Sequence, residues 1–241
     1  MALELQQQGY HVFHQSYFGA PGQPESLERI PLEVFDLALD WLKQQPGVDA
    51  DHIAVLGASK GAEAALLVAS RRNDLSAVVA GMPSSVVWKG INWAVGGAST
   101  LTSWTANGED LPAMSYAPWN PADGLISLYR SVEDPAFTEQ AQGAAIPIEN
   151  SSAKLLLICG EAETLWPACP MARMLAARSE EKQGPAVTVL AYENAGHFLF
   201  GVPVSADASF YPQLGALGGT IEGNAMARAD SWPKVLGFLA P

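Results

Sequence analysis

Residues 53–71 constrain the fold of this chain more than any other segment. Residues 53–57 read I-A-V-L-G, a continuous apolar run, and residues 60–71 are rich in alanine and leucine. An apolar run without alternation is typical of a parallel strand buried on both faces, whereas the second run predicts a helix. The two runs are joined by G-A-S-K-G, in which glycines stand two positions before and after Ser59. The sequence therefore predicts a strand, a tight turn and a helix in direct succession.

Strand and helix patterns alternate along most of the rest of the chain. This alternation predicts one α/β domain over residues 1–241, with a mostly parallel sheet and helices on both faces. In such a sheet the chemistry gathers at the carboxyl ends of the strands. The other expected strands are 11–18, 75–80, 154–159 and 187–192, and the other expected helices are 27–45, 170–177 and 232–239.

Composition narrows the partners and the compartment. With 49% apolar residues and a formal net charge of −12, the chain is globular and is not expected to bind nucleic acid or an anionic membrane. No segment reaches the roughly 18–20 apolar residues of a membrane span, and residues 1–10 lack the regions of a signal peptide. Cys159 and Cys169 are too few for a disulfide framework, and Cys159 ends an apolar run as a buried core residue would. We therefore expect a reducing, cytoplasmic compartment.

The segment 82–145, called the insertion below, interrupts the alternation. It holds Trp88, Trp93, Trp104 and Trp119 together with several glycines and prolines, and it shows little periodicity. A structureless loop of that length is uncommon in a compact domain. The insertion is therefore predicted to be lid-like, with short helices of its own. For any one of its tryptophans, packing inside the protein is a better expectation than contact with a substrate.

The turn at 57–61 matches the G-x-S-x-G pattern of a nucleophile elbow. A strained turn of this kind holds the serine hydroxyl out of the sheet, and the two glycines let strand and helix pack closely. The backbone N–H of Lys60, at the start of the helix, would bind an oxyanion. The alternative is a serine that only caps the helix. The strand and the helix on either side favour Ser59 as a nucleophile.

A serine nucleophile needs a base, and the chain has four histidines. His11 and His14 precede Ser59, although a hydrolase of this type takes its residues in the order serine, acid, histidine. His52 lies at the opposite end of the Ser59 strand. His197 follows the last expected strand in a glycine-containing loop, and it is therefore the predicted base.

The acid is expected just after the strand 154–159, in the loop G-E-A-E-T at 160–164. Glu161 and Glu163 compete for this role. Glu163 lies further from the strand end, from where its side chain can turn towards His197, and Glu161 is then a solvated surface charge. Glu163 would hold the imidazole tautomer and stabilise the imidazolium that forms during attack.

Longer motifs carry a resemblance to a known family. They are F-G-A-P-G at 18–22, I-P-L-E at 30–33, S-K-G-A-E at 59–63, P-I-E at 147–149, G-E-A-E at 160–163 with Trp166, and A-G-H at 195–197. These motifs closely resemble the C-terminal hydrolase domain of the acyl-CoA thioesterase and bile acid-CoA:amino acid N-acyltransferase family. The resemblance extends from about residue 9 to residue 239.

This resemblance implies an α/β-hydrolase fold and the cleavage of an acyl thioester, most of all acyl-CoA. The reaction would pass through an acyl-enzyme on a triad of Ser59, His197 and Glu163. The family usually has Asp where this chain has Glu163, but the fold accepts either acid. No metal ion or other cofactor is expected.

Family members also carry a β-sandwich domain and the first strands of the hydrolase sheet ahead of the helix that here ends at Gly9. The sequence shows neither, so the loop that supplies a second oxyanion N–H is expected to be missing. Residues 17–20 are the candidate replacement. The expected substrate-binding residues are Tyr17, Phe18, Gly19 and Trp166.

Three alternatives stay open. The same triad could hydrolyse oxygen esters or lactones, as dienelactone hydrolase does, or it could transfer the acyl group to an amino acid. The chain could also be a catalytically silent homologue. An open sheet edge would then pair with a second chain, and a homo-oligomer would result.

Overall fold

A four-stranded parallel sheet lies at the centre of the computed structural model, which describes residues 1–240. The strand order is β2-β3-β8-β9, and every neighbouring pair is parallel. Each of these strands lies within two residues of a position that the sequence predicts. The strands are β2 (Ala54–Ala58), β3 (Ala77–Gly81), β8 (Lys154–Gly160) and β9 (Val187–Tyr192).

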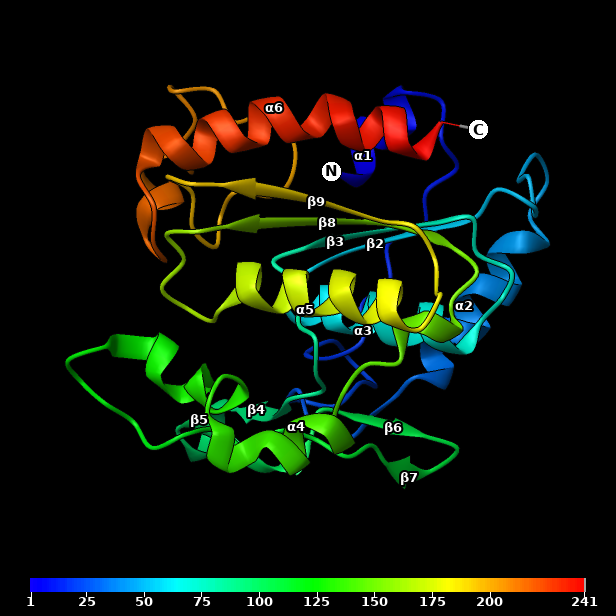
Figure 1. Cartoon of the computed structure of the whole chain (residues 1–241). Helices are drawn as coiled ribbons and strands as arrows, with labels where there is room; N and C mark the ends of the chain where they lie inside the picture. Colours follow the sequence, from blue (N-terminus) through cyan, green and yellow to red (C-terminus); the bar gives the residue numbers. More distant parts are fainter. Residues whose placement is uncertain (241) are drawn as a thin grey trace.

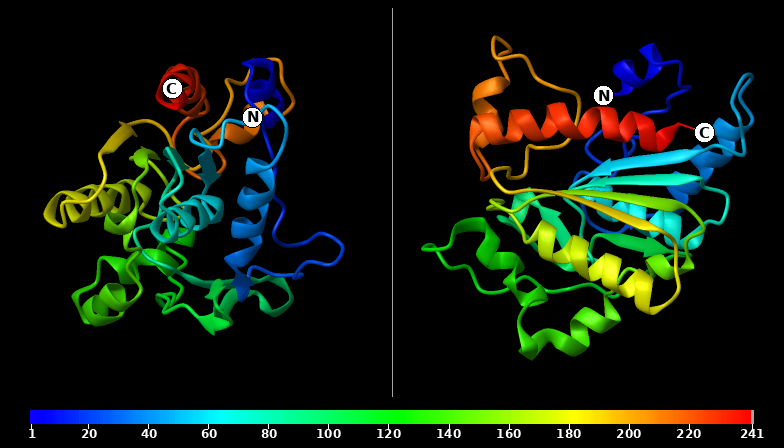
Figure 2. Two further views of the ribbon diagram at one scale, coloured as in Figure 1. Left: turned by 90° about the vertical axis from the view of Figure 1, so that its right-hand side faces the viewer. Right: turned by 45° about the horizontal axis from the view of Figure 1, so that its top comes forward.

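Helices cover both faces of this sheet, as predicted (Figure 1). On one face lie α3 (Lys60–Arg71) and α5 (Ala168–Glu181), and on the other lie α6 (Ile221–Leu239) and the short α1 (Ala2–Gln7). Figure 2 shows α2 (Glu33–Lys43) beside α3. Along residues 1–240, no helix is both long enough and apolar enough to span a bilayer.

α3, the helix that follows Ser59, is enclosed on almost every side. Nine of its twelve residues are buried, between the sheet and the insertion. A helix that is buried all round needs no polar face, which explains why this segment is so rich in alanine and leucine. Small side chains also let neighbouring elements approach the helix closely.

β2 is an edge strand, which corrects the prediction that it is buried on both faces. Ser59 follows the last residue of β2, and its N–H donates to the Gly81 carbonyl of β3 (2.9 Å). The N–H and C=O groups of successive residues in a strand point to opposite sides, so those of Ala54, Leu56 and Ala58 point away from β3. Nothing within residues 1–240 pairs with that side of β2. β2 is accordingly only partly buried, whereas every residue of β3 is buried.

Residues 11–18 do not form the strand that the sequence predicts. None of their N–H groups donates to a backbone carbonyl within residues 1–240, and no strand lies alongside them. A strand requires a partner for its ladder of hydrogen bonds. The segment is held by aromatic contacts instead: Phe13 packs on Trp41 (5.2 Å between ring centres) and Tyr17 packs on Phe35 (5.3 Å).

The helix predicted at 27–45 begins later, at Glu33. The residues before it are drawn towards the insertion, where Ile30–Pro31 form β1 and pair in parallel with β6 (Trp104–Ala106). Long-range pairing therefore overrides the local helical pattern. The last helix, α6, is longer than predicted and begins at Ile221, after a Thr220 cap that bonds the Gly223 N–H.

The insertion forms a layer of its own below α3 and α5 in Figure 1. Trp88 and Trp104 are fully buried in it, as expected for core tryptophans, whereas Trp93 and Trp119 are 58% and 54% exposed. Most of this layer lies against the helices, on their side away from the sheet. Besides β6 it contains β4 (Lys89–Asn92), β5 (Gly97–Thr102), β7 (Glu109–Asp110) and α4 (Thr138–Gly143), together with short 3-10 turns.

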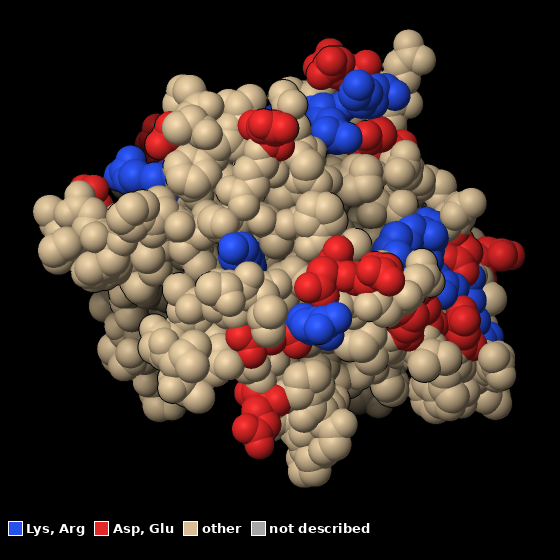
Figure 3. Space-filling view, turned by 90° about the horizontal axis from the view of Figure 1, so that it is seen from below, with Lys and Arg blue, Asp and Glu red and all other residues tan. Residues whose placement is uncertain are grey.

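The face that the insertion presents is largely uncharged. Figure 3, seen from below, shows scattered acidic and basic side chains, mostly beside one another and some near the middle of the face, with wide uncharged areas between them. The net charge of −12 is therefore not gathered into one continuous acidic patch on this face. The large apolar side chains that the insertion exposes are Trp93, Val95, Leu101, Trp119 and Leu125.

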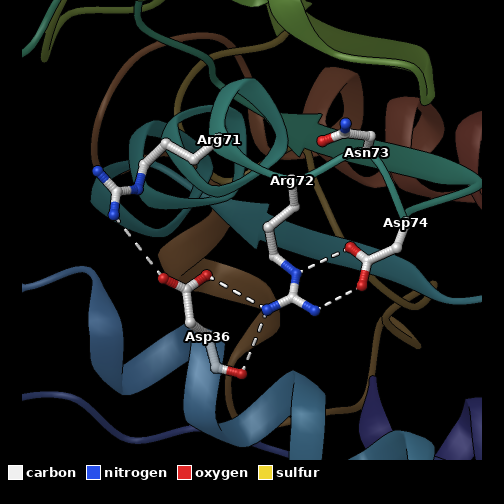
Figure 4. A pocket seen from close by; sticks show the side chains of 5 residues that line it. All are labelled: Asp36, Arg71, Arg72, Asn73 and Asp74. Atoms are coloured by element: carbon white, nitrogen blue, oxygen red, sulfur yellow. Dashed lines mark hydrogen bonds and ion pairs between the residues drawn. The ribbon is translucent and has the colours of Figure 1, made fainter.

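A cluster of charged side chains joins the end of α3 to α2 (Figure 4). The Arg72 guanidinium bonds to Asp40 (2.7 Å) and Asp74 (2.9 Å), and it lies 3.5 Å from Asp36. The Arg72 side chain is only 14% exposed. The hollow between these residues lies at the opposite end of α3 from Ser59, and its charges are paired with one another. The cluster therefore serves the fold rather than the chemistry.

Replacing Arg72 by methionine is expected to lower the free energy of unfolding by about 1–2 kcal/mol at pH 7. The hydrogen bonds from Arg72 and Lys43 hold the pKa of Asp74 well below its usual range. A lowered carboxyl pKa gives stability that is present above the unfolded-state value, about 3.9, and is lost as the pH falls below it. Urea unfolding should therefore show a smaller deficit near pH 3 than at pH 7. An equal deficit at both pH values would contradict this assignment.

Candidate active site

Ser59 lies in the turn between β2 and α3, in a conformation that L-residues rarely adopt. Its φ is 55° and its ψ is −123°. Such a conformation costs on the order of 1–3 kcal/mol and persists only where the surrounding structure enforces it. A Cβ atom on Gly57 would stand 2.0 Å from the Gly61 carbonyl oxygen, so strand and helix approach as closely as only glycine permits. The turn thus has the strained geometry of an elbow.

Free N–H groups stand next to Ser59 at the first turn of α3. The N–H groups of Lys60 and Gly61 have no acceptor within residues 1–240, whereas those of Ala62 and Glu63 donate to the Ser59 carbonyl (2.9 and 3.1 Å). Unpaired N–H groups at a helix N-terminus attract a negatively charged oxygen. The Lys60 N–H is therefore available as the oxyanion donor that the sequence predicts.

Glu163 and His197 form a buried pair. Oε1 of Glu163 is hydrogen-bonded to Nδ1 of His197, and the two residues are 7% and 6% exposed. Burial raises the pKa of Glu163, against the opposing effect of the hydrogen bond to His197. A carboxylate on Nδ1 leaves Nε2 able to accept a proton from a nucleophile. Glu161, the alternative acid in the same loop (the acid loop, 161–167), pairs instead with Arg173 at the surface.

The base loop, residues 193–200, crosses the ends of the strands towards Ser59. A Cβ atom on Gly81 would lie 2.4 Å from the Phe200 ring, so Phe200 packs directly on the last residue of β3. The Gly81 carbonyl is also the acceptor for the Ser59 N–H. Base loop and nucleophile turn therefore meet at the same end of the sheet. The structure bonds His197 to Glu163, but across residues 1–240 it makes no hydrogen bond between His197 and the Ser59 hydroxyl.

A bridge segment, residues 217–220, ties the acid loop to the base loop. The Leu217 carbonyl accepts the N–H groups of both Thr164 (3.4 Å) and His197 (3.0 Å). The N–H of Gly219 donates back to the acid loop (2.9 Å). Each loop is therefore bonded to the same short piece of backbone, which fixes the acid and the base relative to one another.

Asn224 supports this arrangement, although no motif in the sequence points to it. Its side chain is fully buried near the start of α6. Oδ1 accepts the Gly196 N–H (2.9 Å), and Nδ2 donates to the carbonyls of Gly218 (3.1 Å) and Thr220 (2.8 Å). The amide thus joins the base loop to the bridge segment. Only the glycine pair before α6 hints at this close packing in the sequence.

Tyr17, predicted to bind substrate, lies beside the nucleophile turn. Its hydroxyl is 3.7 Å from where a Cβ atom on Gly61 would be, and its ring packs on Trp104 (5.6 Å). Burial, together with the charge of Glu63, raises the pKa of Tyr17 to about 12. The phenol therefore stays neutral and packs under the first turn of α3.

The loop 17–20 does not provide all the free donors expected of an oxyanion loop. The Gly19 N–H already donates to the Pro24 carbonyl (2.7 Å), so it is not available to a substrate oxygen. Phe18 stacks on the exposed Trp93 of the insertion, with 5.8 Å between ring centres. The loop is therefore closed on itself and attached to the insertion.

Trp166, the remaining residue predicted to bind substrate, is buried next to the base. It is 1% exposed, and its ring lies 6.1 Å from the His197 imidazole and 5.5 Å from Tyr129 of the insertion. Within residues 1–240 its indole N–H has no acceptor. A buried donor without a partner is uncommon in folded proteins. Trp166 thus provides an unpaired indole N–H and an apolar surface on the side of the site where Glu163 lies (the acid side).

Cys159 and Cys169 form a disulfide, so the expectation of reduced cysteines is wrong. Cys159 is the buried core residue that the sequence predicts, but its sulfur meets that of Cys169 in the first turn of α5. The acid loop turns the chain back on itself after β8, and this return brings the two sulfurs together. The prediction of a reducing compartment rested on unpaired cysteines and loses that support.

Replacing both cysteines by alanine is expected to lower the free energy of unfolding by about 3 kcal/mol, because the disulfide closes a short loop in the unfolded chain. That loop carries Glu163, so any activity that uses the Glu163–His197 pair should fall as well. Urea unfolding and thiol titration check this pair. Two titratable thiols in the unreduced, denatured protein would contradict the disulfide.

The family model described as "BAAT / Acyl-CoA thioester hydrolase C terminal" matches residues 30–241. "Acyl-coenzyme A thioesterase 2, mitochondrial" of Mus musculus is 26% identical over 242 residues, which cover 95% of this chain and 49% of that protein. "Acyl-coenzyme A amino acid N-acyltransferase 1" of Mus musculus is 28% identical over 242 residues, 97% of this chain and 54% of that protein. The chain spans about half the length of these relatives.

A solved structure supports the fold. The uncomplexed acylaminoacyl peptidase of Pyrococcus horikoshii has a TM-score of 0.50 and 13% sequence identity, and the match covers 86% of this chain and 26% of that chain. At this identity the likeness concerns the fold alone. With the parallel sheet, the covering helices and the strand–turn–helix at Ser59, it confirms the predicted α/β-hydrolase fold.

Proposed function

Because the chain belongs to the family of BAAT / acyl-CoA thioester hydrolase C-terminal domains, we propose that it cleaves acyl-CoA thioesters through an acyl-enzyme on Ser59. One observation carries the proposal: the strained turn of Ser59 and the buried Glu163–His197 pair stand at the same end of the sheet. The names of the relatives support acyl-CoA as the substrate class.

Acylation begins with the Ser59 hydroxyl. Its Oγ attacks the thioester carbonyl carbon while Nε2 of His197 takes the hydroxyl proton. The carbonyl oxygen becomes an oxyanion, which the Lys60 N–H stabilises. The C–S bond then breaks, and CoA leaves as a thiol with the proton that His197 returns. Glu163 holds the imidazole and stabilises its charged form throughout.

Deacylation repeats these roles with water. His197 takes a proton from the water as its oxygen attacks the ester carbonyl of the acyl-enzyme, and the Lys60 N–H again holds the oxyanion. The bond to Ser59 breaks, the proton returns to its hydroxyl, and the carboxylate product leaves. A single oxyanion donor supports a slower reaction than two, since one donor contributes roughly 2.7–4 kcal/mol to the transition state.

The substrate contacts follow from the walls of the site. Tyr17, Phe18 and Gly19 are proposed to line the nucleophile side, and Trp166 the acid side. The insertion, which adjoins both through Trp93 and Tyr129, is proposed to receive the acyl chain.

Acyl transfer to an amino acid is the second candidate, and the similarity to an N-acyltransferase favours it. The first half-reaction would be the same. An amine rather than water would then attack the acyl-enzyme, and the product would be an N-acyl amino acid. Mass spectrometry of reactions that contain glycine or taurine separates the two candidates.

The test is CoA release by the wild-type chain from acyl-CoA substrates of several chain lengths, measured beside hydrolysis of p-nitrophenyl esters. We expect thioester turnover, with acylation of Ser59 visible by intact mass. Ester turnover with no CoA release at any chain length would instead indicate an ester or lactone hydrolase. Failure of a fluorophosphonate to label Ser59 in the folded protein would indicate a catalytically silent chain, and gel filtration would then show whether it forms an oligomer.

A further inference from the structure

A buried ion pair follows the nucleophile along α3. The Lys60 ammonium donates to both oxygens of the Glu63 carboxylate, at 2.9 and 2.8 Å. Lys60 is 7% exposed and Glu63 is 0% exposed. Charged groups are buried to this extent only when they are fully paired. Burial raises the pKa of Glu63 and lowers the pKa of Lys60, which in both cases disfavours the charged form.

Two donors from the insertion complete the surroundings of this carboxylate. The backbone N–H of Trp88 (3.1 Å) and the indole N–H of Trp104 (2.7 Å) both reach Oε1 of Glu63. The Lys60 ammonium also lies 5.8 Å from the centre of the Trp104 ring, within reach of a cation–π contact. Four donated hydrogen bonds on one side chain suit an ionised carboxylate, which only accepts. Glu63 therefore binds α3 and the insertion together.

The insertion reaches the base from the other side. Trp88, which donates to Glu63, packs edge-on against Tyr129 with 4.9 Å between ring centres. Tyr129 packs against Trp166 (5.5 Å), and Trp166 packs against His197 (6.1 Å). A hydrogen bond from the Trp88 backbone, followed by three contacts between aromatic rings, thus leads from the helix of the nucleophile, through the insertion, to the base.

The stability of the fold does not by itself require charges at these positions. Replacing a buried ion pair by well-packed apolar side chains is often neutral or stabilising, whereas removal of one partner alone is costly. The surroundings are aromatic, and an uncharged pair that keeps one acceptor for the N–H groups of Trp88 and Trp104 would suit them. The charges contribute directional hydrogen bonds. These charge-assisted bonds hold the Lys60 side chain and two tryptophans in one geometry.

We propose that Lys60 and Glu63 are a positioning pair that holds the insertion against the nucleophile turn, and that this pair sets the preference of the site for long acyl chains. The inference rests on the proposed function, because it concerns where the acyl chain lies during attack on the thioester. A long chain extends to the insertion and needs it in place. A short chain ends near Ser59 and does not.

The double variant Lys60→Met/Glu63→Gln tests this pair, because it removes both charges and keeps a side-chain oxygen as acceptor for the N–H groups of Trp88 and Trp104. We expect Tm to stay within a few degrees of the wild-type value. The ratio of kcat/KM for palmitoyl-CoA to that for acetyl-CoA should fall about tenfold to hundredfold, whatever the change in acetyl-CoA turnover itself. Glu63→Gln alone should lower Tm as well, because it leaves the Lys60 ammonium without a counter-charge.

Glu149→Gln is the matched control. It breaks an ion pair with Arg178 outside the site and should leave the ratio unchanged. A double variant that folds and keeps the wild-type ratio would overturn the proposal and reduce the pair to a packing role. If the wild type released no CoA from either substrate, the proposed function would fail, but the positioning pair would still be tested. Labelling rates with short-chain and long-chain alkyl fluorophosphonates would then replace the turnover ratio, with the same expected change.

Discussion

Replacement of Ser59 by alanine is expected to lower the rate of CoA release by roughly 10³–10⁶-fold, because no other group can form the acyl-enzyme. The loss should be chemical rather than structural. Within residues 1–240 the Ser59 hydroxyl makes no hydrogen bond. The Ser59 backbone carbonyl, which accepts N–H groups from the first turn of α3, is unchanged by the substitution. The measurement is thiol release under saturating acyl-CoA, with Tm recorded for both proteins.

Ser70→Ala provides the control within the same helix. Within residues 1–240 the Ser70 hydroxyl bonds only to the Leu67 carbonyl (2.8 Å), far along α3 from the turn, so activity should stay within about twofold. Intact mass spectrometry adds a second readout, because the wild type should gain the mass of the acyl group and Ser59→Ala should not. CoA release at the wild-type rate by Ser59→Ala would rule out the proposed nucleophile.

Glu163→Gln is expected to lower kcat by roughly 10²–10⁴-fold with little change in KM. The glutamine amide can donate to Nδ1 of His197, which would leave the proton on Nε2 and prevent that nitrogen from accepting the Ser59 proton. The variant also loses the negative charge that stabilises the imidazolium. Volume and burial are nearly unchanged, so the effect reports on the chemistry of the pair.

Glu161→Gln is the matched control, two positions away in the same loop. Its carboxylate pairs with an Arg173 side chain that is 55% exposed, and surface pairs of this kind contribute little, so we expect kcat within about twofold of wild type. The two variants together decide which glutamate is the acid. Equal losses in both would show that the loop, rather than one carboxylate, is what matters.

The parts of the fold that the sequence predicted correctly have a local signal. The strands β2, β3, β8 and β9 are short apolar runs, and α3 is a run of strong helix formers that follows a glycine-containing turn. The elbow belongs to the same class, since Gly57 and Gly61 reveal the close approach of strand and helix without knowledge of anything distant. For such elements the residues nearby in the sequence are sufficient for the prediction.

Four of the errors depend on a distant partner. Residues 11–18 have the composition of a strand, but no strand within residues 1–240 pairs with them. β2 has the composition of a buried strand but lies at the edge of the sheet. The helix predicted at 27–45 begins later because residues 30–31 pair with β6 instead. Cys159 and Cys169 meet only because the acid loop turns back on itself. Composition cannot report which distant segment arrives alongside a given one.

The candidate site divides in the same way. Ser59, Glu163 and His197 each follow a strand and could be selected by position and chain order. Glu63 and Asn224 could not be assigned their contacts, because their partners come from the insertion and from two separate loops. The sequence therefore marks the reacting groups, whereas the residues that hold them emerge only from the three-dimensional arrangement.

The bridge segment also determines how the site can come apart. Because the acid loop and the base loop are both bonded to residues 217–220, neither can leave its place without breaking hydrogen bonds that the other shares. Local opening there is expected to be cooperative, with Glu163 and His197 displaced in a single event. Glu163 and His197 are therefore either both in place or both displaced. A state in which His197 is correctly placed and Glu163 is not is scarcely populated.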